Sequence, residues 1–178
     1  MEPTEKEKVV FLNEHFAYEV EELVFCDSFI ASLFHHRAAI DRKGLFAGLQ
    51  NTGMEHFLLH ARVLLEFLFF GPHEDEPRAS DYVKNWSDIR QWTETLKTFQ
   101  DRVNKEITHL SWRRVGISPE DKTWMLQPIV DDLLNTTGLF LTSVDNSYLE
   151  ERARNLWGLL ALRKTAGIDV FGMLMGMD

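Results

Sequence analysis

The chain of 178 residues has 44% hydrophobic and 26% charged residues, a composition typical of a globular protein and not of a disordered or fibrous one. Its net charge of −9 argues against general DNA or RNA binding, because contacts to phosphates need clustered Lys and Arg. The single cysteine, Cys26, excludes an intrachain disulfide. Together with the charged N-terminal segment MEPTEKEKVV it predicts a cytoplasmic protein. Cys26 lies in an apolar run without a neighbouring His, which predicts a buried, unreactive thiol.

The first predicted helix runs from about residue 5 to about residue 38. Thr4 followed by Glu7 forms a capping-box pattern, and apolar residues then recur at spacings of three and four. We expect a break near Asp27 and Ser28. The segment RKGLFAGLQNTG, which contains three glycines, is predicted to connect this helix to the next.

The second predicted helix, about residues 53 to 70, is apolar around nearly its whole circumference, which is typical of a central buried helix. Its charged residues Arg62 and Glu66 are four positions apart and share one narrow face. Because these two charges interrupt the most apolar segment of the chain, we expect no membrane span. The segment GPHEDEPRASD that follows is predicted to be an exposed loop.

The third predicted helix spans about residues 87 to 112, capped by Ser87, with one apolar stripe along it. The fourth starts at Ser118 and Pro119 and carries Trp124, and the fifth covers about residues 147 to 163. No segment alternates as a strand does. The sequence therefore predicts an all-α fold in a single domain, residues 1–178. This fold is an up-down bundle of four main helices with a short additional C-terminal helix.

Three polar residues of the third helix form a candidate catalytic group. At about 100° per residue, Arg102, Glu106 and His109 fall on one side of the helix, beside the apolar stripe. An Arg can bind a phosphate and stabilise the charge that develops during its transfer. A His that titrates near neutrality can serve as general acid or base. The alternative interpretation is an exposed Arg–Glu pair with His109 at the edge of the core.

A second group lies in the segment HFLLH, where His56 and His60 are four positions apart on one helical face. Two imidazoles at this spacing can share a metal ion, and His109 could supply a third ligand from a neighbouring helix. Phe57 stands where a hydrolytic His-Glu-x-x-His motif has its Glu. The alternative is a structural role for both histidines in the core of a buried helix.

The segments FLLHARVLLEF and RVNKEITHL together resemble the HEPN superfamily of small all-α domains, across roughly residues 50 to 112. The resemblance implies a metal-independent endoribonuclease of prokaryotic defence or toxin–antitoxin systems, without a cofactor. Arg102 would stabilise the phosphate, His109 would be the catalytic base or acid, and both would act at a homodimer interface. Val103 stands where catalytic members favour a polar residue, which leaves a non-catalytic RNA-binding or protein-interaction domain as the alternative.

The apolar circumference of the second helix also predicts a homodimer, because exposed apolar area of that extent marks an interface. We expect the two-fold interface to involve the second and third helices. The functions predicted from the sequence are thus, in order, a ribonuclease, a non-catalytic RNA-binding or protein-interaction domain, and a His-coordinated metal-binding bundle.

Overall fold

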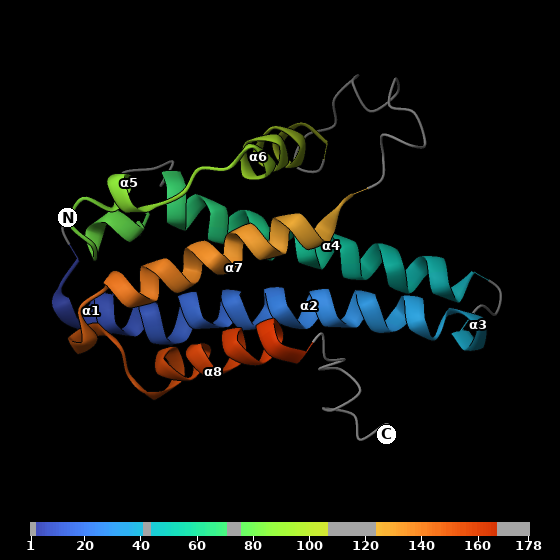
Figure 1. Cartoon of the computed structure of the whole chain (residues 1–178), viewed down its shortest axis with the longest axis horizontal. Coiled ribbons are helices and arrows are strands. Elements are labelled where there is room, and N and C mark those ends of the chain that lie inside the picture. Colours follow the sequence, from blue (N-terminus) through green and yellow to red (C-terminus); the bar gives the residue numbers. More distant parts are fainter. Residues whose placement is uncertain (1–2, 41–43, 71–75, 107–123, 167–178) are drawn as a thin grey trace. The chain divides into compact units, whose positions relative to one another are not determined.

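The part of the chain that the structure describes is predominantly helical. A computed structural model describes residues 3–40, 44–70, 76–106 and 124–166, and these ranges contain helices and turns but no strand (Figure 1). The prediction of an all-α fold is confirmed. The chain divides into two compact units, unit 1 with residues 1–61 and 144–178 and unit 2 with residues 62–143.

The elements of the described ranges are α-helices joined by short π-helical and 3₁₀ segments. In chain order they are α1 (Glu5–Val10), η1 (π, Phe11–Phe16), α2 (Ala17–His35), α3 (Arg37–Ile40), α4 (Leu45–Leu65), η2 (π, Glu66–Phe70), η3 (3₁₀, Ala79–Asp81), α5 (Trp86–Ile89), α6 (Glu94–Glu106), α7 (Leu126–Ser143), η5 (3₁₀, Asn146–Tyr148) and α8 (Glu151–Ala166).

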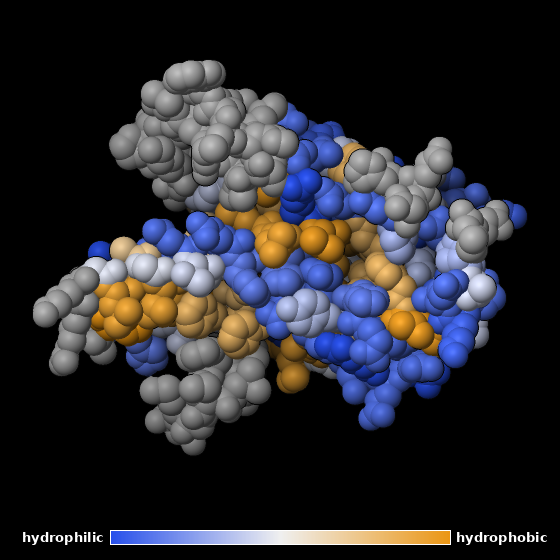
Figure 2. Space-filling view, turned by 180° about the vertical axis from the view of Figure 1, so that it is seen from behind, coloured by the Kyte–Doolittle hydropathy of each residue, from blue (hydrophilic) through white to orange (hydrophobic). Residues whose placement is uncertain are grey.

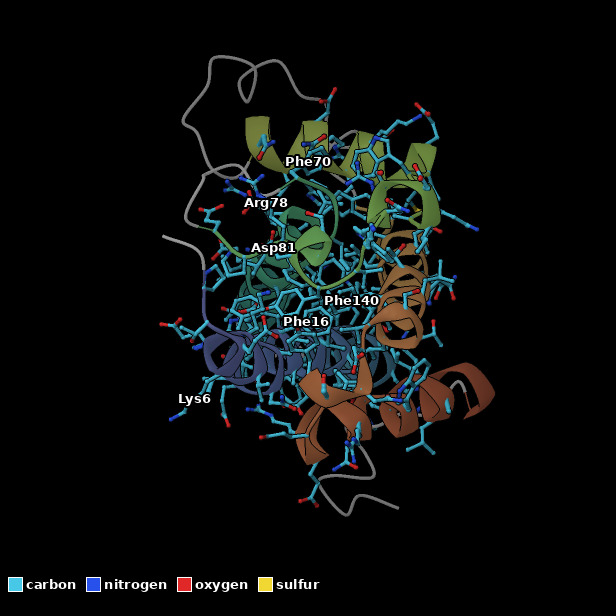
Figure 3. The ribbon with its side chains drawn as sticks, turned by 90° about the vertical axis from the view of Figure 1, so that its left-hand side faces the viewer. Lys6, Phe16, Phe70, Arg78, Asp81 and Phe140 are labelled. Carbon is cyan, nitrogen blue, oxygen red and sulfur yellow. The ribbon has the colours of Figure 1, made fainter. Side chains whose placement is uncertain are left out.

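The first helix of unit 1 begins where the sequence predicts it. Thr4 and Glu7 form the expected capping box, with the Thr4 Oγ1 accepting from the backbone N–H of Glu7. Lys6, in the first turn of α1, is exposed and points away from the ribbon (Figure 3). The break expected near Asp27 and Ser28 is wrong, because α2 continues to His35. The Asp27 carboxylate accepts from Arg163 of α8, so it does not cap a helix at this point.

Helix α4 starts earlier than predicted, at Leu45, so most of the expected glycine-rich connection is helical. Gly44 precedes it with a left-handed φ of 79°, a conformation that glycine adopts without strain. Gly53 lies inside the helix, where a Cβ would sit 3.1 Å from the ring of Phe29. The close packing of α4 on α2 therefore explains a glycine that sequence reasoning assigns to a loop.

The predicted third helix is two helices in unit 2. Helix α5 ends at Ile89, and α6 begins at Glu94. Thr93, and not Ser87, caps the longer helix, since its Oγ1 accepts from the backbone N–H of Leu96. Residues 107–123, with the predicted end of that helix and the start of the fourth at Ser118, lie outside the described residues. Trp124 precedes α7 and is not part of it.

The core of unit 2 is aromatic. Phe140 of α7 is fully buried (Figure 3) and contacts the rings of Phe67, Tyr82 and Trp86. The Trp86 Nε1 also donates to the backbone carbonyl of Leu68 in η2, at 2.6 Å. This bond satisfies a carbonyl near the end of the long helix, where intrahelical partners run out.

The predicted core of the second and third helices is confirmed, with one correction. Leu64, Leu68, Phe99 and Val103 are each at most 1% exposed. Leu59, however, is 55% exposed, so α4 is not buried around its whole circumference. Hydrophobic side chains reach the surface in Figure 2. Among the helices of the described ranges, none has the length and apolar composition that a bilayer-spanning helix requires.

Candidate metal centre

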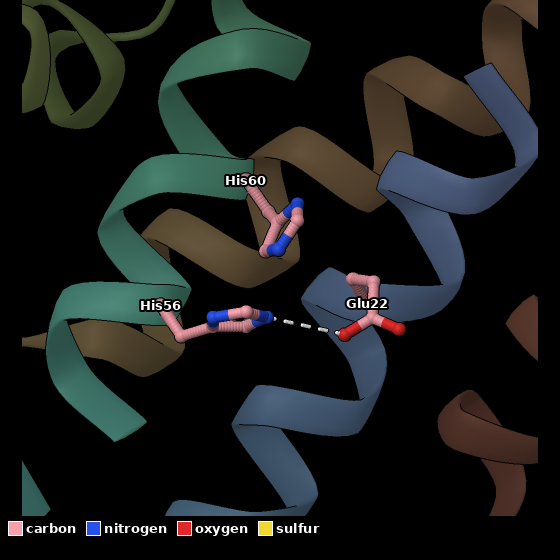
Figure 4. A group of neighbouring side chains, drawn as sticks. All are labelled: Glu22, His56 and His60. Carbon is pink, nitrogen blue, oxygen red and sulfur yellow. Dashed lines mark ion pairs between the residues drawn. The ribbon is translucent and has the colours of Figure 1, made fainter. Parts of the chain in front are cut away.

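Two polar faces meet where α2 packs beside α4 in unit 1. His56 and His60 lie one turn apart on α4, with ring centroids 4.5 Å from each other. Glu22 of α2 points toward them (Figure 4), and Glu19 lies one turn earlier on the same helix. The i,i+4 spacing of the histidines and the i,i+3 spacing of the glutamates place each pair on one side of its helix.

His60 is the buried member of this group. Its side chain is 5% exposed, and its Nδ1 lies 2.7 Å from the Oε2 of Glu19. An ionised carboxylate has no hydrogen to donate, so the Nδ1–H of His60 is the donor. The Nε2 of His60 is buried without a hydrogen-bond partner among the described residues. A buried polar atom without a hydrogen-bond partner destabilises the fold by about 1–3 kcal/mol. Because Nε2 makes no such bond, it is available to bind a metal ion.

His56 and Glu22 form the second, more accessible pair. The His56 Nε2 lies 3.4 Å from the Glu22 Oε2, and their side chains are 48% and 28% exposed. One ligand atom from each of Glu22, His56 and His60 lies within 4.8 Å of the other two. The negative charge of Glu22 also raises the pKa of Tyr18, whose ring contacts His60 edge-on. One ligand atom from each of the three residues can therefore reach a single ion.

The acidic residues of α2 have two kinds of partner, arginines of α8 and histidines of α4. Glu21 and Asp27 form ion pairs with Arg152 and Arg163 of α8, at 2.7 and 3.0 Å. Glu19 is instead bonded to a histidine of α4, as is Glu22 in the pair above. An Arg is always charged and so neutralises its carboxylate, whereas a histidine does so only when it is protonated. The carboxylates that face α8 are therefore paired with permanent positive charges, and those that face α4 are not.

The donor set suits a divalent transition-metal ion. Imidazole nitrogen and carboxylate oxygen are the ligands of Zn²⁺ and of Fe, Ni and Cu ions in proteins. A metal-bound His typically donates its other N–H to a carboxylate, which fixes the ring, and Glu19 makes that bond to His60. No protein-family model, curated protein or solved structure matches this chain.

Sequence reasoning found two of these four residues. It paired His56 and His60 correctly, but it named His109 as the third ligand, and His109 lies outside the described residues. Glu22 is the third donor that the structure brings to the group. The signal for Glu19 and Glu22 is weak, because α2 and the preceding η1 carry several acids. No spacing rule shows which of those acids meets α4.

The candidate catalytic residues of the third predicted helix lie in unit 2. Arg102 of α6 is partly buried next to the buried Val103, which agrees with its predicted place beside the apolar stripe. Its guanidinium carbon lies 4.0 Å from the centroid of the Trp124 ring. Glu106 is the last residue of α6. With His109 outside the described residues, the expected Arg–His group stays a prediction.

Cys26 is buried, as the sequence predicts. Burial raises the pKa of its thiol to about 12, and the charges of Glu22 and Asp27 add to the effect. Because the thiolate is the nucleophile and the metal ligand, this side chain is unreactive at neutral pH.

Proposed function

We propose that this protein binds one divalent transition-metal ion in unit 1, through Glu22, His56 and His60. Glu19 holds the ring of His60 and does not itself bind the ion. The observation that carries the proposal is the buried His60, whose Nδ1 is bonded to Glu19 at 2.7 Å while its Nε2 has no partner among the described residues. The ion would supply the interaction that this nitrogen lacks and would neutralise Glu22.

The test is calorimetric titration of the purified full-length chain with Zn²⁺, after dialysis against EDTA. We expect one ion bound per chain. The variants His56→Ala and His60→Gln should each weaken binding by more than the roughly 10–100-fold that loss of a hydrogen-bonding partner of a ligand costs. His60→Gln keeps a side chain of similar size in the buried position, and circular dichroism checks that it is folded.

The matched control is His15→Ala. His15 is an exposed histidine of η1 in the same unit, so its loss should leave binding unchanged. Stoichiometric Zn²⁺ binding that survives both His60→Gln and His56→Ala would refute the proposed site.

We also propose, from the resemblance to HEPN domains, a metal-independent ribonuclease that uses Arg102 and His109. What supports it in the structure is the position of Arg102, partly buried beside Val103. Cleavage of a mixed RNA substrate should persist in EDTA and should end in Arg102→Ala and His109→Ala, with Glu106→Ala weaker in effect. Losing a general acid or base costs on the order of 10²–10⁴ in rate. Absence of cleavage by the wild type would favour an RNA-binding or protein-interaction domain.

The homodimer is likewise a proposal, supported by the 55% exposure of Leu59 on α4. Contiguous exposed apolar side chains mark a contact surface, whereas single ones are common on monomeric proteins, so the oligomeric state is what tests the proposal. Light scattering at micromolar concentration should give twice the mass of the chain. A monomer under these conditions would contradict the prediction.

A further inference from the structure

We infer that the metal ion at Glu22, His56 and His60 keeps a coordination position open to solvent and binds a small anionic ligand there. This inference rests on the proposed metal site and deepens it. An open coordination position would distinguish a metal site that binds an external ligand from a structural metal site that only links α2 to α4.

The number of protein donors leaves a coordination position of the ion free. The group formed by the described residues contributes three ligand residues, two histidines and one glutamate. Structural zinc sites have four protein ligands, whereas sites that bind a substrate or water have three and leave one position free. Glu19 is the nearest further carboxylate in the group, but it is bonded to His60 Nδ1 and so positions a ligand.

Exposure rises across the three donors. The His60 side chain is 5% exposed, Glu22 28% and His56 48%. The two histidines approach from α4 and Glu22 approaches from α2 (Figure 4). An ion bound by these donors would therefore be held by the buried His60 and be reachable from solvent past Glu22 and His56.

The charge at the ion indicates the class of ligand. A divalent ion bound by one carboxylate and two neutral imidazoles has a formal charge of +1 on the ion and its three ligands, and the carboxylate of Glu19 adds one negative charge outside them, at His60. Arg152 and Arg163 of α8 are paired with Glu21 and Asp27 of α2. A monodentate anion with an oxygen or nitrogen donor, such as acetate or azide, would complete the coordination and neutralise this charge.

The experiment uses the full-length chain loaded with one equivalent of Cu²⁺ or Co²⁺ and titrated with azide. We expect a saturable change in the visible spectrum, with an azide-to-copper charge-transfer band in the Cu²⁺ form. The paramagnetic relaxation of water protons by the loaded protein should fall in parallel, because azide displaces bound water. Acetate, a monodentate oxygen donor, should compete with azide for the same position.

Two controls locate the signal and separate the possible failures. His15→Ala should leave the azide response unchanged, and His60→Gln should abolish it together with stoichiometric loading. If the wild type fails to load a metal ion, the proposed function and this inference are both refuted. If it loads but shows no azide response and no enhanced water relaxation, the metal site stands with a fourth protein ligand, and only the open position is refuted.

Discussion

Replacement of Glu19 by Gln tests whether this residue acts on the metal ion through His60. The substitution keeps the size of the side chain and an amide oxygen as acceptor, but it removes the negative charge. The bond to His60 Nδ1 is 2.7 Å long, and His60 is shielded from water. Loss of such a partner typically lowers metal affinity 10–100-fold, which corresponds to about 1.4–2.7 kcal/mol. Calorimetric titration of the apo protein with Zn²⁺ measures this difference directly.

The control for the Glu19 experiment is Glu21→Gln. Glu21 lies two residues away on α2 and is paired with Arg152, so its replacement removes the same charge from the same helix without touching His60. We expect this variant to bind Zn²⁺ about as tightly as the wild type. Equal effects of the two substitutions would mean that Glu19 acts only by long-range electrostatics. Wild-type affinity in Glu19→Gln would refute its role in holding the ring.

The remaining predictions concern the stability of the fold and the reactivity of Cys26. Asn13→Ala should lower the free energy of unfolding by about 2–4 kcal/mol in urea denaturation, because the buried amide bonds to the carbonyl of Tyr148 and the N–H of Glu150. Cys26 should react with a thiol reagent at pH 8 only after unfolding. Since its pKa rises from 9.0 to about 12 on folding, the wild type should lose stability relative to Cys26→Ala by about 1.4 kcal/mol per pH unit above pH 9. Phe99→Ala, at a fully buried position, should cost about 3–5 kcal/mol.

The sequence by itself determined the helical class, most of the core and the local start of the first helix. Apolar residues at spacings of three and four mark the buried faces of the long helices, and Leu64, Leu68, Phe99 and Val103 are buried as that pattern predicts. The capping box at Thr4 and Glu7 is present. These features depend on neighbours within about one helical turn, so the local sequence contains the information that specifies them.

Tertiary packing decided the helix boundaries that the sequence placed wrongly. Local preference makes a glycine-rich segment a loop, yet residues 45–53 belong to α4, and Gly53 provides the space for Phe29 of α2. Asp27 and Ser28 favour a break by local chemistry, yet α2 continues because Asp27 pairs with Arg163 across to α8. In both places a contact between distant segments outweighs a local propensity of about 1 kcal/mol per residue.

In the candidate metal centre, some residues can be found from the local sequence and others only from the tertiary packing. The spacing of His56 and His60 is visible in the sequence because both lie on one helix. The partners Glu19 and Glu22 lie more than 30 positions away on a helix that also carries Glu21 and Asp27, and all four acids look alike in the sequence. Only the packing of α2 between α4 and α8 decides that Glu21 and Asp27 meet arginines while Glu19 and Glu22 meet histidines. The orientation of a helix about its own axis is set by the elements that pack on it, and that orientation creates the site.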